Sequence, residues 1–193
     1  MSQAQAKRYA HLFDTTRCIN CAACTVACAA TNQPELRLHE DPGWHALPSN
    51  IRRVELNIRD RPSLLLVQCQ HCDNAPCIRT CPFGAMYKEA STGLVKLDEK
   101  RCIGCSYCVA ACPYNVRWKH PKTGLPMKCM GKTCESLVAA GQSPACVAAC
   151  PAEARAFGDL NDPASRISQR VRAGRTIRLL ESRGTEPNYF VVV

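Results

Sequence analysis

CIGCSYCVAACP, at residues 102–113, is the stretch that decides the fold of this 193-residue chain. Its cysteines follow the spacing C-x2-C-x2-C-x3-C, and CINCAACTVAC at residues 18–28 repeats that spacing. Residues 69–82 enlarge it to C-x2-C-x4-C-x3-C-P, and residues 129–151 enlarge it further to C-x4-C-x11-C-x3-C-P. The sixteen cysteines therefore form four groups of four, numbered one to four along the chain.

This spacing favours 4Fe-4S clusters. In a C-x2-C-x2-C-x3-C run, the first three thiolates surround one cluster and the fourth reaches a second cluster. Pro113 follows the run as expected, whereas Cys28 is followed by Ala29. Zinc sites use pairs of cysteines separated by a longer spacer, and cysteines three residues apart pair poorly as disulfides. We therefore expect neither zinc nor disulfides.

The exchange of fourth cysteines predicts how the groups pair. Groups two and three are neighbours in the sequence, which leaves groups one and four to pair with each other. Four ligand sets follow from this rule. They are Cys18, Cys21, Cys24 and Cys150 for cluster 1; Cys129, Cys134, Cys146 and Cys28 for cluster 2; Cys69, Cys72, Cys77 and Cys112 for cluster 3; and Cys102, Cys105, Cys108 and Cys81 for cluster 4.

The predicted fold class is α+β, with two nested bacterial-ferredoxin-like modules that each bind two 4Fe-4S clusters. Strands are expected at Tyr9 to Asp14, in a hairpin within Gly84 to Lys100, and at Ala152 to Gly158. The domains are residues 1–30 plus 120–158 for the outer module, 61–119 for the inner module, 31–60 for an insert that contacts another subunit, and 159–193 for a C-terminal tail.

The tail is expected to begin with Asp162 as helix N-cap and Pro163 as first helical residue, to stop at Gly174, and to end in a strand at Tyr189 to Val193. We favour a docking role for it. The alternative is that its basic residues form a solvated face. They are Arg166, Arg170, Arg172, Arg175 and Arg178.

The formal charge of +9 resembles that of a nucleic-acid-binding protein. Four clusters would contribute roughly −8, however, so the basic residues mainly balance bound anions. No basic run with interleaved aromatic residues is present, and we expect no nucleic acid as partner.

Residues 1–14 lack an apolar run typical of a signal peptide, and no apolar stretch approaches the roughly 20 residues of a membrane-spanning helix. Membrane contact is thus expected only through partners.

Several residues near the cysteines have two possible roles. His71 and His120 could tune a cluster through hydrogen bonds, or could simply be packed or solvated. Tyr114 and Trp118 are expected to shield a cluster, because burial shifts its potential.

The chain resembles the beta, or iron-sulfur, subunits of the dimethyl-sulfoxide-reductase superfamily of molybdopterin oxidoreductases, above all those of polysulfide, thiosulfate and tetrathionate reductases. The resemblance rests on CINCAACTVAC, CQHCDNAPCIRTCP, CIGCSYCVAACP, SPACVAACP and FGDLNDP. The departure is in group four, where the family usually has C-x2-C and this chain has Met-Gly-Lys-Thr between Cys129 and Cys134.

The resemblance implies a non-catalytic subunit of an anaerobic respiratory complex. It would relay electrons between a molybdopterin-containing catalytic alpha subunit and an integral membrane subunit that reacts with quinone. Cluster 1 would lie nearest the alpha subunit and cluster 4 nearest the membrane. Such subunits are often exported together with their alpha partner, so the periplasmic face is expected over the cytoplasmic face. Two alternatives are a free soluble polyferredoxin and an enzyme in its own right, although no nucleotide-binding loop or activated nucleophile is evident.

Overall fold

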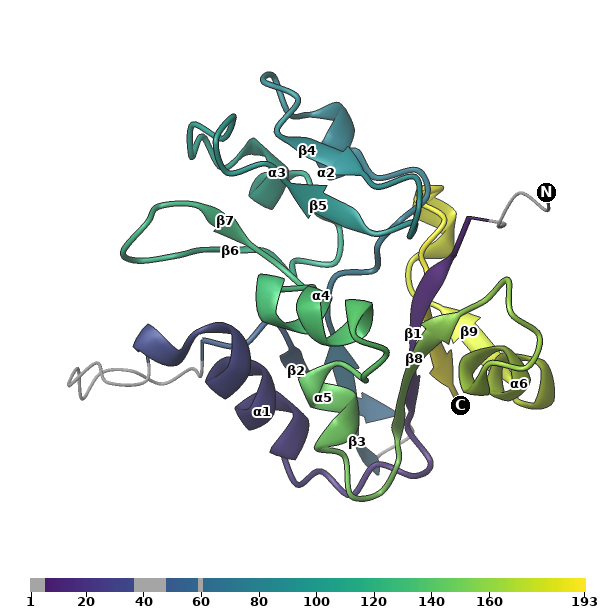
Figure 1. The fold of residues 1–193 in the computed structure, drawn as a ribbon. Helices are drawn as coiled ribbons and strands as arrows, with labels where there is room; N and C mark the ends of the chain where they lie inside the picture. The colour runs from purple at the N-terminus through teal and green to yellow at the C-terminus, as the bar shows by residue number, and fades with distance from the viewer. Residues whose placement is uncertain (1–5, 37–47, 59–60) are drawn as a thin grey trace.

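The computed structural model describes residues 6–36, 48–58 and 61–193 (Figure 1). Four of its helices share one feature: the third cysteine of a group is the second residue of the helix. Helices this short are unstable alone, so tertiary contacts must hold them. They are α1 (Ala23–Asn32) with Cys24, α2 (Pro76–Arg79) with Cys77, α3 (Tyr107–Ala110) with Cys108, and α5 (Ala145–Ala148) with Cys146.

These helices pack in pairs that bring distant parts of the sequence together. Helix α1 packs against α5 and against α4 (Lys132–Ala139), while α2 packs against α3. Figure 1 shows α1 and α5 side by side in the lower half of the molecule, with α2 and α3 in the upper half. Groups one and four are thus neighbours in space, as are groups two and three.

A four-stranded sheet flanks the lower pair of helices. Its strand order is β8 (Arg155–Asp159), β1 (Tyr9–Asp14), β10 (Tyr189–Val192) and β9 (Thr176–Arg178), and only the β1–β10 pair is parallel. Because side chains alternate along a strand, β1 serves two cores. Leu12 packs with Ile167 of α6 (Arg166–Ala173), whereas Phe13 packs with the cysteines of groups one and four.

Three two-stranded hairpins complete the described fold. The hairpin expected within residues 84–100 is present. Two short 3-10 turns, η1 (Pro34–Leu36) and η2 (Glu181–Arg183), lie in the connections. The hairpins are β2 (Arg52–Ile58) with β3 (Arg61–Val67), β4 (Met86–Lys88) with β5 (Val95–Leu97), and β6 (Trp118–Lys119) with β7 (Pro126–Met127).

Two expected boundaries were wrong. The strand predicted at residues 152–158 is β8, which begins three residues later because a turn follows Cys150. Helix α6 is capped by Ser165 and not by Asp162: the Ser165 Oγ accepts the N–H of Ser168 at 3.2 Å, whereas Asp162 accepts the N–H of Ala164. Asp162 therefore shapes the turn that precedes the helix.

The tail is built into the sheet that contains β1. Strand β10 pairs with β1 and with β9, and α6 covers β8 and β1. Of the expected insert, residues 37–47 and 59–60 lie outside the described residues. In the part of the chain that the structure describes, no helix is both long enough and apolar enough to cross a bilayer.

Candidate metal centres

Four cavities in the structure are each lined by four cysteines, and no cysteine lines two of them. Each cavity takes three cysteines from one group and the last cysteine of another group. Cavity 1 is lined by Cys18, Cys21, Cys24 and Cys150; cavity 2 by Cys28, Cys129, Cys134 and Cys146; cavity 3 by Cys69, Cys72, Cys77 and Cys112; and cavity 4 by Cys81, Cys102, Cys105 and Cys108.

The donor sets of the cavities distinguish between kinds of metal site. Four thiolates can hold a single tetrahedral zinc ion or a 4Fe-4S cluster. In all four cavities, however, one cysteine comes from a different group than the other three, which is the exchange typical of two-cluster ferredoxins. The donor sets therefore favour 4Fe-4S clusters over separate zinc ions.

The loops before α1 and α3 have matching backbone conformations. Asn20 and Ala22 in group one, and Gly104 and Ser106 in group three, all have positive φ between 58° and 71°. Alternating right- and left-handed residues turn successive backbone N–H groups toward one point, forming a concavity that binds anions, including iron–sulfur clusters. His71 takes the same left-handed conformation at the matching place in group two.

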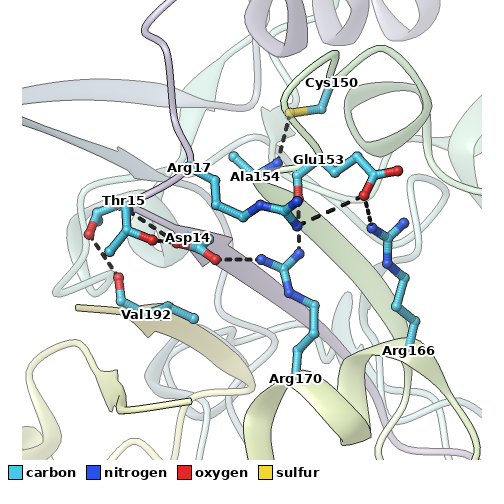
Figure 2. Close-up of polar contacts among 10 residues, drawn as sticks. Asp14, Thr15, Arg17, Cys150, Glu153, Ala154, Arg166, Arg170 and Val192 are labelled. Atoms are coloured by element: carbon cyan, nitrogen blue, oxygen red, sulfur yellow. Dashed lines mark hydrogen bonds and ion pairs between the residues drawn. The ribbon is translucent and has the colours of Figure 1, made fainter. Parts of the chain in front are cut away.

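The turns after the fourth cysteine also match in groups two, three and four. Gly84, Asn115 and Glu153, each three residues past the cysteine, have positive φ. In group four this turn directs the N–H of Ala154 to the Sγ of Cys150 at 3.2 Å (Figure 2). Such donors stabilise a thiolate, which is the form that binds metal.

An ion-pair network holds the turn after Cys150 in place (Figure 2). Arg170 of α6 pairs with Asp14 at 2.6 Å and donates to the carbonyl of Glu153 at 2.9 Å, while Arg166 pairs with the Glu153 carboxylate. Two of the basic residues of the tail are therefore paired within this chain, at the turn that follows Cys150.

In group one, no Cys-Pro turn follows the last cysteine, and the side chain of Asn32 provides hydrogen bonds near that cysteine instead. Helix α1 continues past Cys28, and Asn32 one turn later donates its Nδ2 to the Cys28 carbonyl at 3.0 Å and to the Cys134 Sγ at 3.4 Å. Gly131, in the enlarged loop of group four, packs directly against Asn32, and a Cβ at Gly131 would lie 2.3 Å from the Asn32 Oδ1. The unusual C-x4-C spacing thus makes room for an asparagine that contacts two cysteines of cavity 2.

Polar side chains fill the space between cavities 2 and 3. The Cys129 Sγ lies 3.5 Å from the Gln68 Nε2 and 3.7 Å from the His11 Nε2, and the rings of His11 and His71 stack 6.2 Å apart. Burial lowers the pKa of both histidines well below 6.5, so both are neutral at pH 7. Lys128, also buried, donates to the carbonyl of Cys129 at 3.2 Å.

Two family models, both describing a 4Fe-4S dicluster domain, match residues 63–160 and residues 17–85. This protein belongs to the 4Fe-4S dicluster family. It is 42% identical to the thiosulfate reductase electron transfer subunit PhsB of Salmonella typhi, over 91% of this chain and 88% of that protein. It is 36% identical to a chain of the polysulfide reductase of Wolinella succinogenes (97% and 95% covered) and 39% identical to a subunit of the tetrathionate reductase of Salmonella typhimurium (95% and 71% covered).

The resemblance inferred from the motifs is thereby confirmed: this dicluster protein is related to iron-sulfur subunits of reductase complexes. These three relatives are components of reductases for three different sulfur compounds, so the likeness favours none of the three substrates over the others. The prediction of an iron-sulfur protein of electron transport is also confirmed, with two ferredoxin-like dicluster domains in a mixed α/β fold.

In this dicluster protein, the structure shows where Tyr114, His120 and Trp118 lie relative to the four cavities. Tyr114 is buried and lines cavity 3, as expected of a shielding residue. His120 is buried away from the described cavities and pairs with Glu35 at 2.9 Å. Trp118 donates to Asn50 at 3.0 Å and lines none of the four cavities.

Sequence reasoning missed the buried polar residues among the cavities. Arg117 and Arg155 line cavities 3 and 1, respectively, and both are buried. Each is the fifth residue after the last cysteine of a group, in the pattern Cys-Pro-x3-Arg, and this repetition was a readable signal. His11, Gln68 and Lys128 carry no comparable pattern.

Proposed function

We propose that this chain is an electron-transfer subunit that carries four 4Fe-4S clusters between a molybdopterin-containing catalytic subunit and a membrane subunit that reacts with quinone. The observation that carries the proposal is the division of all sixteen cysteines among four cavities, four to each. Bound there, the clusters would supply one-electron redox chemistry. The residues of the chain would hold the clusters, shield them from water and set their charge environment.

The ligand sets proposed for the clusters are the four sets of cysteines that line the cavities. In each set the fourth cysteine comes from the partner group, which is the exchange typical of two-cluster ferredoxins. Pairing of groups one and four around groups two and three makes one module nested in the other. The packing of α1 against α5 and of α2 against α3 supports this nesting.

The exposure of the cysteines supports a relay that runs from cavity 1 to cavity 4. Cys21 of cavity 1 and Cys105 of cavity 4 are exposed, whereas no cysteine of cavities 2 and 3 is. The loops that carry them lie at opposite ends of the molecule in Figure 1. Electrons would therefore enter and leave at the two ends and pass through the buried cavities between them.

Exposed apolar side chains surround both ends, which supports docking of a partner at each. Ile19 beside cavity 1 is 66% exposed, and Ile103 beside cavity 4 is 61% exposed. Tyr107 and Phe83 are also exposed at the second end. We assign cavity 1 to the catalytic subunit and cavity 4 to the membrane subunit, with the complex on the periplasmic face. Membrane fractionation, together with protease protection of the complex in spheroplasts, tests that location.

Iron analysis tests the proposal directly. Anaerobically purified protein should contain about sixteen irons per chain, and as many acid-labile sulfides, because each cluster holds four of each. Protein with about eight irons would retain the dicluster family but contradict the relay of four. Purification from native membranes should also yield a molybdenum-containing partner; a chain isolated alone and fully loaded would favour the free polyferredoxin instead.

A cysteine variant tests the proposed exchange. Cys28→Ala should remove the EPR signal that Cys134→Ala removes, because both residues line cavity 2, and should spare the signal that Cys21→Ala removes. Cys21 is the matched control because it belongs to the same group in the sequence but lines cavity 1. If Cys28→Ala and Cys21→Ala abolish the same signal, group one holds a cluster by itself and the exchange is wrong.

A further inference from the structure

Two arginines occupy equivalent places in the two pairs of cavities. Arg117 follows Cys112 and Arg155 follows Cys150 in the same pattern, Cys-Pro-x3-Arg. The left-handed residue in each turn, Asn115 or Glu153, is also at the same place, so the chain leaves both cysteines in the same way. Arg117 is 5% exposed and Arg155 is 2% exposed. Arginine is almost never buried without an anionic partner.

Arg155 lies between cavities 1 and 2. Its side chain lines cavity 1, and its Nη2 donates to the Oε1 of Gln68. Gln68 in turn lines cavity 2 and donates to the Sγ of Cys129. The positive charge of Arg155 is therefore within reach of both cavities of the outer pair, directly on one side and through a single amide on the other.

Arg117 has the corresponding position between cavities 3 and 4. It lines cavity 3, and its Nη2 donates to the Sδ of Met86 at 3.1 Å. Met86 lines cavity 4, and it stands at the fifth place after Cys81, the position that an arginine holds after groups three and four. Each pair of cavities thus has one buried arginine that contacts the first cavity and a side chain of the second.

Both guanidinium groups retain donors that no atom of the described residues accepts. The Nε and Nη1 of Arg117, and the Nε and Nη1 of Arg155, are buried without a hydrogen-bond partner among the described residues. A buried unpaired donor costs free energy, and a buried unpaired charge costs more. An anionic cluster in the neighbouring cavity would supply both the acceptors and the opposite charge.

We propose that Arg117 and Arg155 are positioning residues that each act as a fixed counter-charge shared by the two clusters of one pair, raising the reduction potentials of both. This inference rests on the proposed function. Reduction adds one negative charge to a cluster, so a nearby cation stabilises the reduced form more than the oxidised form. The guanidinium stays protonated throughout the physiological range, so the effect does not depend on pH. The neutral His11 and His71 cannot replace it.

The test is an anaerobic redox titration, followed by EPR, of the holoprotein and of charge variants. Arg117→Gln should lower the reduction potentials of clusters 3 and 4 by at least 59 mV, which is a tenfold change in the equilibrium constant for one-electron reduction. The potentials of clusters 1 and 2 should not change. Arg155→Gln should show the reverse pattern. Arg117→Lys and Arg155→Lys keep the charge and should restore most of each shift.

Matched controls are available beside the same cavities. Arg101 lines cavity 4 and Arg53 lines cavity 1, but both are exposed, so water should screen the same loss of charge in Arg101→Gln and Arg53→Gln. The inference is overturned if Arg117→Gln shifts the potentials no more than Arg101→Gln does, or if the Gln and Lys variants shift them equally.

Loss of clusters in a variant can also be interpreted. If Arg117→Gln loses about eight irons while Arg117→Lys keeps all of them, charge is required to retain the anionic clusters, which supports the inference. If both variants lose iron to the same extent, side-chain shape and not charge is required, and the inference fails. Wild-type protein with far fewer than about sixteen irons would instead overturn the proposed function.

Discussion

Replacement of Gly131 by alanine is predicted to disturb cavity 2 through Asn32. Gly131 has a φ of −79°, which alanine adopts without strain, so any effect must come from contacts. An ideal Cβ would lie 2.3 Å from the Asn32 Oδ1 and 2.8 Å from its Cγ. Carbon atoms pack at roughly 3.5 to 4.0 Å, so the amide of Asn32 must move by about 1 Å or more.

The movement would break both hydrogen bonds from the Asn32 Nδ2. The bond to the Cys28 carbonyl contributes about 1 kcal/mol and the bond to the Cys134 sulfur, as a thiolate, about 1.5 kcal/mol. Alanine recovers about 0.5 kcal/mol by restricting the unfolded chain. The expected net loss is therefore about 2 kcal/mol.

Cluster 2 should also become harder to reduce. A donor to a cysteine sulfur stabilises the reduced cluster more than the oxidised cluster, so its loss lowers the potential. If half of the free energy of the hydrogen bond to Cys134 is present only in the reduced cluster, the reduction potential falls by roughly 30 mV, because 59 mV corresponds to about 1.4 kcal/mol for one electron. Anaerobic guanidinium unfolding, followed by cluster absorbance, measures the first effect, and EPR redox titration measures the second.

Asn32→Ala provides the control through a double-mutant cycle. It removes the same two hydrogen bonds and the two atoms nearest the new methyl group, Oδ1 and Cγ, and leaves only the Asn32 Cβ, at 3.1 Å. In the Asn32→Ala background, Gly131→Ala should therefore cost much less than the roughly 2 kcal/mol expected in the wild type. If Gly131→Ala costs as much without Asn32 as with it, the explanation given for the enlarged loop is refuted.

Two further predictions concern the docking of α6. In the wild type, burial alone would raise the pKa of Asp14, but hydrogen bonds from Thr16 and Arg170 hold this pKa below 3.8. The ionised Asp14 therefore stabilises the fold above pH 3.8, and this stabilisation is lost as the pH falls through the lowered pKa. Arg170→Gln removes the cation, so the Asp14 pKa rises. The expected cost of about 2 kcal/mol at pH 7 should persist at pH 5 and shrink only as the pH falls below about 3.8; a cost that already shrinks between pH 7 and pH 5 in guanidinium unfolding would contradict this. Ile167→Ala, at a fully buried site, should cost about 2–5 kcal/mol in the same assay, whereas the exposed Arg172→Ala should stay within about 0.5 kcal/mol.

The cysteine spacing made much of the site predictable, because three cysteines within seven residues leave the backbone few ways to surround one point. The left-handed residues Asn20 and Gly104 occupy matching places for that reason. The strand at residues 9–14 and the hairpin around Gly93 were predictable because their alternation and turn chemistry are local. The strand at the C-terminus was also expected, but its parallel pairing with β1 is a long-range choice that no local pattern reveals.

The missed features depend on contacts between segments that are distant in the sequence. A lone arginine in a basic chain normally indicates a solvated side chain, so Arg117 and Arg155 stand out only when the two Cys-Pro-x3-Arg turns are compared. Asn32 could not be recognised, because its role depends on Gly131, about a hundred residues away. The start of α6 was misplaced because Asp162 and Ser165 are both good N-cap residues, and only the bond to Ser168 distinguishes them.

Cluster binding and folding are expected to be inseparable in this protein. Nine of the sixteen cysteines are buried, and they pack among residues of both large cores. Without metal, burial raises the pKa of buried thiols such as Cys129 and Cys146, so these thiols would be neutral and could not balance the buried guanidinium of Arg155. Metal binding would ionise the thiols and provide that balance. The arginines proposed to raise the cluster potentials would then destabilise the folded protein without clusters, so the chain would reach its final structure only when the clusters bind.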